Sequence, residues 1–368
     1  NKMKKVAVIP AVVLAALCTF TGCKTEEVEK VIAPLVSDGQ TTESTEEAQE
    51  EKDPLIPEID TSVEIQAGSR VAVVSKSTSG EFWGLVKKGM EQAIADVNEA
   101  YGFKKEDQVT MTFEGASDEK DVESQVNTID AVIAENPDVL CVSASDMDSL
   151  QAQLEAAKEN GIPVVAFDSG VTDSKMVRAF RGTDNTRVGE IAAYRLATAI
   201  GKMGKVAVFS AQEKTQSIQE RVSGFTNYIT NYPDIEVVEI VYQDQVDDMT
   251  AAMQEVLDKY PQLDGVFCDN ADIADLYLDM KKDETKDSIV MVGVDATAKQ
   301  QEAIRNAKEV GVVSQQPYAM GYQTIWTALL TTAPKKSVEI KRNVRIDPAW
   351  IDSSNIDDPT YSSYLYAN

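Results

Sequence analysis

Short apolar runs alternate with amphipathic stretches along most of the chain from residue 70 onward. The runs are rich in Val, as in "RVAVVS", "DVLCVSA" and "KVAVFS", which is typical of strands that are buried on both faces. The stretches between them repeat apolar residues every three or four positions, as expected of helices that bury one face. Strands that alternate with helices of this length predict parallel sheets with helices on both sides.

The predicted elements form two similar arrays. In the first array we expect strands at 70–75, 108–115, 138–144 and 162–168, with helices at 82–97, 122–134 and 150–158. In the second we expect strands at 205–210, 235–242, 264–270, 288–295 and 310–316, with helices around 224–228, 249–257, 273–280, 300–307 and 322–330. The two arrays predict a body of two α/β lobes.

Two adjacent aromatic residues, Phe82 and Trp83, open the first of these helices. Adjacent residues on a helix point about 100° apart, so one apolar stripe buries only one of them well. The stripe that begins at Leu85 and Val86 accommodates Phe82 and leaves Trp83 in line with Lys87. We therefore expect Trp83 to have a partner outside the core.

The first 23 residues have the pattern of an export signal. Three lysines precede an apolar run that is too short for a comfortable transmembrane helix, and small residues follow it. The ending "FTGC" resembles the lipobox of bacterial lipoproteins, in which Cys23 would be lipidated. An ordinary cleaved signal with a chance cysteine is the alternative.

A strongly acidic segment follows, at residues 24–64. It carries three lysines against thirteen carboxylates and few aliphatic side chains. Such a segment cannot bury enough apolar surface to offset the entropy of ordering, so we expect a disordered acidic tether.

The composition argues against several classes of function. The formal net charge of −26 opposes binding to nucleic acid, whose phosphates need cationic partners. The chain has no histidine, the commonest general base and metal ligand, and lacks GxSxG, P-loop and metal-binding spacings, so we expect no enzyme, cofactor or metal. A glycosidase-type pair of carboxylates is the remaining enzymatic alternative. Cys141 and Cys268 each end a predicted strand, and we expect two separate buried thiols.

Polar residues follow the carboxyl ends of six predicted strands. These ends read "SKSTSGEFW", "SASDMD", "FDSG", "CDNAD", "GVDAT" and "VSQQPY". In open α/β sheets, ligands bind outside the carboxyl ends of the strands. Asp, Asn and Ser are also good helix N-caps, so any single one is as well explained by capping. Six such ends together predict one polar cleft.

Several of these segments together resemble a known family. "VAVVSKSTSGEFWGLVKKGMEQA", "IPVVAFDSG", "RGTDNTRVGEIAA", "QERVSGF", "VFCDN", "MVGVDAT" and "SQQPYAMGY" are similar, in this order and spacing, to the signatures of the periplasmic-binding-protein type I family. The nearest branch is the ribose/galactose-type sugar-binding lipoprotein subunits of ABC importers. The resemblance implies an α/β fold of two doubly wound parallel-sheet lobes joined by a three-crossing hinge. It places lobe one at 69–183, lobe two at 184–315, a return to lobe one at 316–346 and a C-terminal tail at 347–368.

The resemblance also implies which residues bind the ligand. The aromatic faces of Phe82 and Trp83 would contact a sugar ring, although core packing for Phe82 and a lobe contact for Trp83 are alternatives. Asp168 would accept hydrogen bonds from hydroxyl groups, and Arg221 would donate to two adjacent oxygens unless it is a surface arginine. The implied polar cage is completed by Asn270, Asp295 and Gln315.

The chain departs from the ribose binders at three places. Ser169 stands where they have an arginine, Gly80 where they have an asparagine, and Asp244 or Gln245 where they have a second-lobe aromatic ring. These changes enlarge the cleft and leave it more acidic. We therefore expect a ligand that is bigger than a simple pentose or that carries amino groups.

The resemblance implies an extracytoplasmic, lipid-anchored and monomeric protein that captures a sugar and delivers it to an ABC importer permease. Two alternatives remain open from the sequence. One is a ligand sensor for a receptor kinase or a chemoreceptor, and the other is a binding protein for a nucleoside or another non-sugar ligand.

Overall fold

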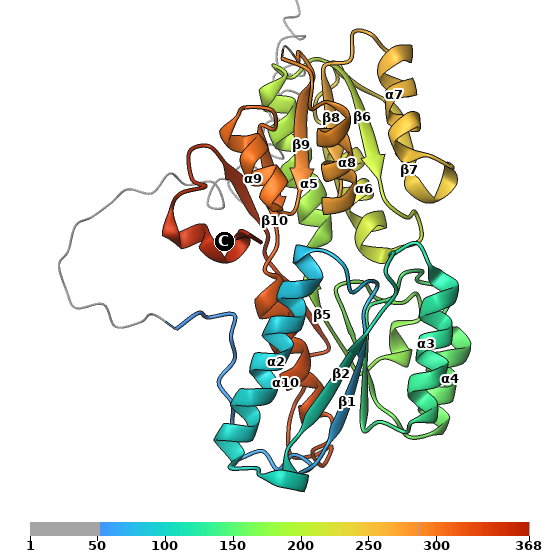
Figure 1. Ribbon diagram of the computed structural model, residues 1–368, viewed down its shortest axis with the longest axis vertical. Coiled ribbons are helices and arrows are strands. Elements are labelled where there is room, and N and C mark those ends of the chain that lie inside the picture. Colours follow the sequence, from blue (N-terminus) through green and yellow to red (C-terminus); the bar gives the residue numbers. More distant parts are fainter. Residues whose placement is uncertain (1–51, 286, 368) are drawn as a thin grey trace, which may run out of the picture. The chain divides into compact units, whose positions relative to one another are not determined.

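The structure, a computed structural model, describes residues 52–285 and 287–367 (Figure 1). These residues belong to one compact unit, Ser44–Asn368. The predicted signal and the lipidation site at Cys23 lie outside the described residues. Among the helices that are described, none has the length and apolar character needed to cross a membrane.

The first sheet has six parallel strands in the order β11-β5-β4-β3-β1-β2. Their bounds are Asn343–Ile346, Ala179–Thr183, Val164–Phe167, Val139–Val142, Arg70–Val74 and Thr110–Glu114. Alternate side chains of β1 face opposite sides of the sheet. Val71 and Val73 pack in the core with α2 (Glu81–Tyr101) and α10 (Pro317–Leu330), whereas Ala72 and Val74 pack with α3 (Val122–Ala134) and α4 (Gln151–Glu159). Figure 1 shows these two helix layers on either side of the sheet, which with it form lobe one.

The second sheet repeats the plan in the order β12-β10-β9-β8-β6-β7, and here β12 runs antiparallel to β10. The bounds of these strands are Ala349–Asp352, Gly311–Ser314, Val290–Val294, Gly265–Cys268, Gly204–Ser210 and Ile235–Tyr242. The helices of this lobe two are α5 (Asn185–Ala199), α6 (Gln216–Ile229), α7 (Met249–Lys259), α8 (Ala271–Met280) and α9 (Ala298–Arg305). The predicted fold class, with two doubly wound lobes, is confirmed.

Three segments of the chain pass between the two sheets and their helices. One joins β5 to α5, the second joins β10 to α10, and the third joins β11 to β12. Each crossing lies at the carboxyl end of a strand, the edge at which ligands bind in open α/β sheets. The hinge therefore adjoins the predicted cleft.

The prediction that the apolar face of helix α2 buries Phe82 and leaves Trp83 outside the core was wrong. The buried face of α2 contains Trp83, Val86 and Met90, while Phe82 is only half-buried. Trp83 and Val86 are three residues apart, as one helix face requires, and both belong to the core cluster of lobe one, in which the indole lies edge to face with Phe167. Trp83 therefore belongs to the core, and Phe82 packs against the indole ring of Trp83.

Two predicted non-globular segments contain ordered structure. Residues 52–64, assigned to the disordered tether, pack on lobe one: Ile56, Ile59 and Val63 join its core, and Tyr101 donates a hydrogen bond to the Val63 carbonyl. Residues 347–368, expected to be a tail, contain β12, whose Trp350 is fully buried. Both segments carry enough apolar surface to offset ordering, which charge counting alone did not reveal.

The two cysteines of the globular body are separate buried thiols, as predicted. Cys141 lies in β3, near the centre of the first sheet. Cys268 is the last residue of β8 in the second sheet, and neither cysteine forms a disulfide. Burial raises the pKa of both thiols above the ordinary value, so both are protonated and unreactive at neutral pH.

Candidate functional site

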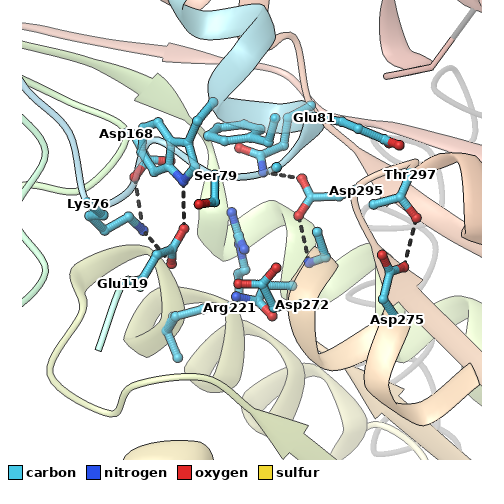
Figure 2. Close-up of a pocket in the computed structure, with 17 residues that line it drawn as sticks. Lys76, Ser79, Glu81, Glu119, Asp168, Arg221, Asp272, Asp275, Asp295 and Thr297 are labelled. Atoms are coloured by element: carbon cyan, nitrogen blue, oxygen red, sulfur yellow. Dashed lines mark hydrogen bonds and ion pairs between the residues drawn. The ribbon is translucent and has the colours of Figure 1, made fainter. Parts of the chain in front are cut away.

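A cavity of about 180 Å³ lies between the carboxyl ends of the two sheets (Figure 2). Both lobes contribute to its wall. Its lining residues are Lys76, Ser79, Gly80, Glu81, Phe82, Trp83, Glu119, Asp168, Ile218, Arg221, Asn270, Ala271, Asp272, Asp275, Asp295, Thr297 and Gln315.

The cavity brings together most of the residues that the sequence proposed for ligand binding. Those that line it are Phe82, Trp83, Asp168, Arg221, Asn270, Asp295 and Gln315. Ser169 lies one layer deeper and is fully buried, with its hydroxyl 2.8 Å from that of Ser217 on α6. Asp244 lies in a short 3₁₀ helix after β7, outside the lining, where it accepts a hydrogen bond from the backbone of Glu213.

Asp168 follows β4 directly and adopts a left-handed backbone conformation with φ 61°. The Lys76 ammonium lies 3.0 Å from its Oδ2, and the hydroxyls of Ser143 and Ser169 also donate to that oxygen. Within the described residues, Oδ1 accepts no hydrogen bond, although the side chain is almost fully buried. Asp168 therefore offers one free acceptor at the wall of the cavity.

Lys76 is a functional candidate that the sequence analysis missed. Only 5% of the residue is exposed, and its ammonium also approaches the Glu119 carboxylate at 3.8 Å. Burial by itself lowers the pKa of Lys76, but the charges of Asp168 and Glu119 outweigh burial and raise it. Lys76 is therefore charged at physiological pH and balances two carboxylates. The signal was present in "SKSTSG", where a lysine follows a buried strand.

The aromatic residues occupy the lobe-one end of the cavity. Trp83 donates from Nε1 to Glu119 Oε1 at 2.7 Å, and its ring lies 5.7 Å from the Lys76 ammonium. Phe82 meets Trp83 edge to face, with ring centroids 4.9 Å apart, and lies 6.0 Å from the ring of Tyr366. The two aromatic side chains thus form an apolar wall next to charged groups, as an amphipathic ring ligand requires.

Arg221 reaches the cavity because α5 and α6 approach closely. A Cβ on Gly189 would lie 2.1 Å from the Arg221 carbonyl oxygen, so only glycine fits there. Arg221 donates from Nε to Asn185 Oδ1 and from Nη1 to the Asp269 carbonyl, both at 2.9 Å. Within the described residues, Nη2 makes no hydrogen bond, and Arg221 is 3% exposed. A donor is therefore directed to the cavity without a protein acceptor.

Asn270 provides a second donor of this kind. Its Oδ1 caps α8 by accepting a hydrogen bond from the Ile273 backbone, which fixes the orientation of the amide. The side chain is 8% exposed, and its Nδ2 makes no hydrogen bond to any described residue. The sequence left helix capping and ligand binding as alternatives for this residue. Asn270 can serve both, because Oδ1 caps the helix and Nδ2 remains available to a ligand.

Asp295, in contrast, has its acceptor positions occupied. Its Oδ1 accepts from Gln315 Nε2 and from the Tyr366 hydroxyl, both at 2.7 Å, and its Oδ2 accepts from the Ala271 backbone at 2.9 Å. Tyr366 was missed because its segment had been taken for a tail. The network joins the carboxyl end of β9, the crossing at Gln315 and the C-terminal segment.

Two further acidic residues of the cavity, Asp272 and Asp275, lie three positions apart on α8. The pKa of Asp272 is raised to about 7, first by the loss of hydration of its carboxylate in the cavity and next by the charge of Glu119, although the residue as a whole is exposed. Burial likewise raises the pKa of Asp275 to about 6, opposed in part by a hydrogen bond from Thr297. The sequence analysis quoted "CDNAD" as a strand end but did not single out either residue.

Comparison with known proteins agrees with this geometry. The family model described as "Periplasmic binding protein domain" matches residues 71–333. The chain belongs to this family. The ribose import binding proteins of Bacillus subtilis and Escherichia coli are 27% and 24% identical over 55% and 52% of the chain. The matched regions span 66% and 64% of those two relatives, so the chain aligns with about two thirds of their length.

Solved structures are similar over more of the chain. An ABC transporter solute-binding protein of Agrobacterium vitis with bound D-fucose is 28% identical, with a TM-score of 0.74, covering 81% of this chain and 100% of that one. A carbohydrate transporter solute-binding protein of Agrobacterium radiobacter in complex with D-arabinose is 27% identical, with a TM-score of 0.72, covering 81% and 98%. These likenesses support the recognised family and its fold.

The lobes of this periplasmic binding protein touch on both sides of the cavity. On the side of α9, the Ala298 backbone donates to Glu81 Oε2 at 3.0 Å. On the side of α6, the Gly170 backbone donates to Gln216 Oε1 at 2.7 Å, and Arg345 forms an ion pair with Glu220 at 2.9 Å. The structure therefore shows the closed arrangement of the cleft.

Proposed function

We propose that this periplasmic binding protein is an extracytoplasmic solute-binding subunit that captures a sugar between its lobes and delivers it to an ABC importer permease. The observation that carries the proposal is the set of unsatisfied polar atoms at the cavity. Arg221 Nη2 and Asn270 Nδ2 are free donors, Asp168 Oδ1 is a free acceptor, and all three belong to buried side chains.

A polyhydroxy ligand fits these atoms because each hydroxyl group both donates and accepts. Leaving a buried polar group unpaired costs about 1–3 kcal/mol, so a ligand that pairs several of them gains affinity and selectivity together. Phe82 and Trp83 supply the apolar wall for the C–H face of the ring. Relatives and structural neighbours that are named for ribose or carry bound D-fucose support the same ligand class.

Closure of the lobes is the step that binding would control. Arg221 and Asn270 belong to lobe two, whereas Asp168 and Trp83 belong to lobe one, so a ligand contacts both sets only when the cleft is closed. A ligand that binds the closed form better shifts the population toward it and presents one surface to the permease.

A thermal-shift screen followed by calorimetry tests the ligand class. The panel contains monosaccharides, disaccharides and nucleosides. We expect at least one saccharide to raise the melting temperature and to bind with one-to-one stoichiometry. Stabilisation by nucleosides alone, or by no saccharide, would overturn the proposal.

Anchoring is a separate part of the proposal and rests on the sequence. We propose that Cys23 is lipidated and holds a monomeric protein at the outer face of the cell membrane. Cell fractionation of a Cys23→Ala variant tests this point, because the variant should leave the membrane fraction. Retention of the variant in that fraction would contradict the anchor.

A further inference from the structure

The walls of the ligand cavity carry more carboxylates than cations. Two cationic side chains, Lys76 and Arg221, line it. The carboxylates that line it are Glu81, Glu119, Asp168, Asp272, Asp275 and Asp295. A neutral sugar would leave this imbalance in place, and solvent screens it poorly at the buried Asp168 and Asp295 and only in part at the other carboxylates.

The two cations are already engaged by the protein. Lys76 lies between Asp168 and Glu119, at 3.0 Å and 3.8 Å. Arg221 donates hydrogen bonds from Nε and Nη1 to protein acceptors. Among the described side chains, it forms no ion pair with the acidic residues of α8. In the described part of the chain, neither Lys76 nor Arg221 therefore forms an ion pair with Asp272 or Asp275.

Asp272 and Asp275 have few partners within the protein, and Asp272 is exposed to solvent at the cavity. Within the described part of the chain, the Asp272 carboxylate accepts no hydrogen bond and forms no ion pair, and Asp275 accepts one hydrogen bond, from the Thr297 hydroxyl at 2.8 Å. Figure 2 shows both side chains at the cavity, on the same side as Arg221 and Asp295.

Acidic groups surround this pair from both lobes. The charges that act on Asp272 are those of Glu119, Asp118, Asp295 and Asp275. Those that act on Asp275 are Glu81, Asp279 and the cation Lys299, which itself lies 2.5 Å from Asp279. Repulsion from these neighbouring carboxylates therefore adds to desolvation in raising both pKa values, and a bound cation would relieve it.

An independent observation favours a ligand that also carries acceptor oxygens. Arg221 Nη2 and Asn270 Nδ2 belong to side chains that are more than nine-tenths buried, line the same cavity and have no protein acceptor. A polyamine without hydroxyl groups would leave both donors unpaired. A metal ion is not favoured either, since no group of three carboxylate or thiol side chains in the described residues is placed to hold one.

We infer that the cavity takes an amino sugar or a closely related polyhydroxy amine, with its ammonium group on Asp272 and Asp275 and its hydroxyl groups on Arg221, Asn270 and Asp168. The inference rests on the proposed function of sugar binding and narrows it to one chemical class.

Calorimetry with matched pairs of sugars tests the inference. The probes are D-glucosamine with D-glucose, D-galactosamine with D-galactose, D-mannosamine with D-mannose, and 6-amino-6-deoxy-D-glucose, at low ionic strength and pH 7.5. We expect at least one amino sugar to bind about 10- to 150-fold more tightly than its neutral partner, the value of one charge-assisted hydrogen bond. The N-acetylated sugar, which keeps the shape but loses the charge, should lose this advantage.

A double variant identifies the residues responsible. In Asp272→Asn/Asp275→Asn the ratio of the two affinities should fall to about one. Glu255→Gln/Asp258→Asn, on the surface of α7, also removes two negative charges but lies outside the cavity, and it should keep the wild-type ratio. The ratio should also fall between pH 7.5 and pH 5, because the carboxylates with pKa values of about 7 and about 6 become neutral.

The outcomes separate this inference from the function on which it rests. Equal or tighter binding of the neutral sugars would overturn the amino-sugar inference and leave sugar binding in place. An amino-sugar preference that survives in the double variant would overturn the assignment to Asp272 and Asp275. Failure of every sugar, neutral or amino, would overturn the proposed function and the inference together.

Discussion

Asp168 and Asp295 occupy equivalent places in the two lobes. Each follows the third strand in the spatial order of its sheet, β4 or β9, and each has a left-handed backbone, with φ 61° and φ 78°. Both line the same cavity. Their partners differ: Asp168 is held by the Lys76 ammonium, whereas Asp295 is held by neutral donors from Gln315 and Tyr366. The pseudo-symmetric fold thus supplies two carboxylates, and the lobe-one carboxylate retains a free oxygen.

Replacing Lys76 by methionine should destabilise the fold and abolish ligand binding. The change keeps the length of the side chain but leaves Asp168 and Glu119 buried without a counter-charge. Breaking a buried pair in this way costs about 3–5 kcal/mol. Urea unfolding measures the loss.

The exposed pair of Lys52 and Glu58 supplies the control for Lys76. Lys52→Met should change the free energy of unfolding little, because exposed ion pairs contribute at most about 1 kcal/mol. A Lys76→Met protein as stable as Lys52→Met would contradict the role given to Lys76.

Ligand binding should change the fluorescence of Trp83. The chain has three tryptophans, and Trp326 and Trp350 are buried away from the cavity lining. We therefore expect a saccharide that binds to alter the emission of the wild-type protein, and Trp83→Phe to lose most of that change. A Trp83→Phe protein that keeps the full signal would remove Trp83 from the ligand's surroundings.

Adding one methyl group at Gly189, a residue that does not line the cavity, should nevertheless weaken ligand binding. In Gly189→Ala the new Cβ would meet the Arg221 carbonyl oxygen and the Phe225 backbone nitrogen, at 2.1 Å and 2.5 Å. The helices α5 and α6 must then separate, at a cost of about 1–3 kcal/mol, and Arg221 is displaced. Thermal unfolding and calorimetry measure the two effects.

Gly84 provides the same chemical change without a clash. It lies in α2, and no atom stands within 4 Å of its Cβ position. Gly84→Ala should stabilise the protein by about 0.5–1 kcal/mol, because alanine favours the helix. Equal effects of the two substitutions would refute the packing explanation for Gly189.

The buried carboxyl of Glu309 should make stability depend on pH. Glu309 is 1% exposed and its Oε2 has no partner among the described residues, so burial raises its pKa well above the ordinary value of 4.5. Since the folded pKa exceeds the unfolded one, its contribution to stability is complete below about pH 4.5 and is lost as pH rises toward the folded pKa, by about 1.4 kcal/mol per pH unit.

Glu309→Gln should therefore gain stability over the wild type as the pH rises from 4.5 to 8. Urea unfolding at several pH values measures the difference. Glu302→Gln, on the exposed face of α9, should show no such trend. A constant difference between Glu309→Gln and the wild type across this range would mean that Glu309 does not titrate abnormally.

The bounds of helices and strands were predicted best where the apolar pattern of the sequence is long and uninterrupted. The strand at Ile235–Tyr242 and the helix at Val122–Ala134 have the predicted bounds, because their apolar patterns are long and uninterrupted. Helix α5 was quoted as a family signature but not predicted from periodicity, since its apolar residues include many small alanines. Strand β12, with only four residues, carried no pattern long enough to recognise.

The candidate site was predictable where it follows a strand. Asp168, Asn270 and Asp295 were found because carboxyl ends of parallel strands meet at one edge. Glu119 also follows a strand, β2, but the polar loop after that strand was not singled out, and Tyr366 reaches the site from the segment that follows β12. Long-range pairing of this kind decides which side chains meet, and local pattern does not encode it.

The measurement that tests the central claim most directly is a calorimetric titration of a saccharide that binds the wild-type protein into Arg221→Ala. If the ligand's oxygens pair with Arg221 Nη2, affinity should fall about 10- to 150-fold, as expected for a charged hydrogen bond of about 1.5–3 kcal/mol. Arg305→Ala, which removes an exposed ion pair with Asp357, is the control and should keep the wild-type affinity. Unchanged affinity in a folded Arg221→Ala protein would contradict the claim that the ligand binds between the lobes.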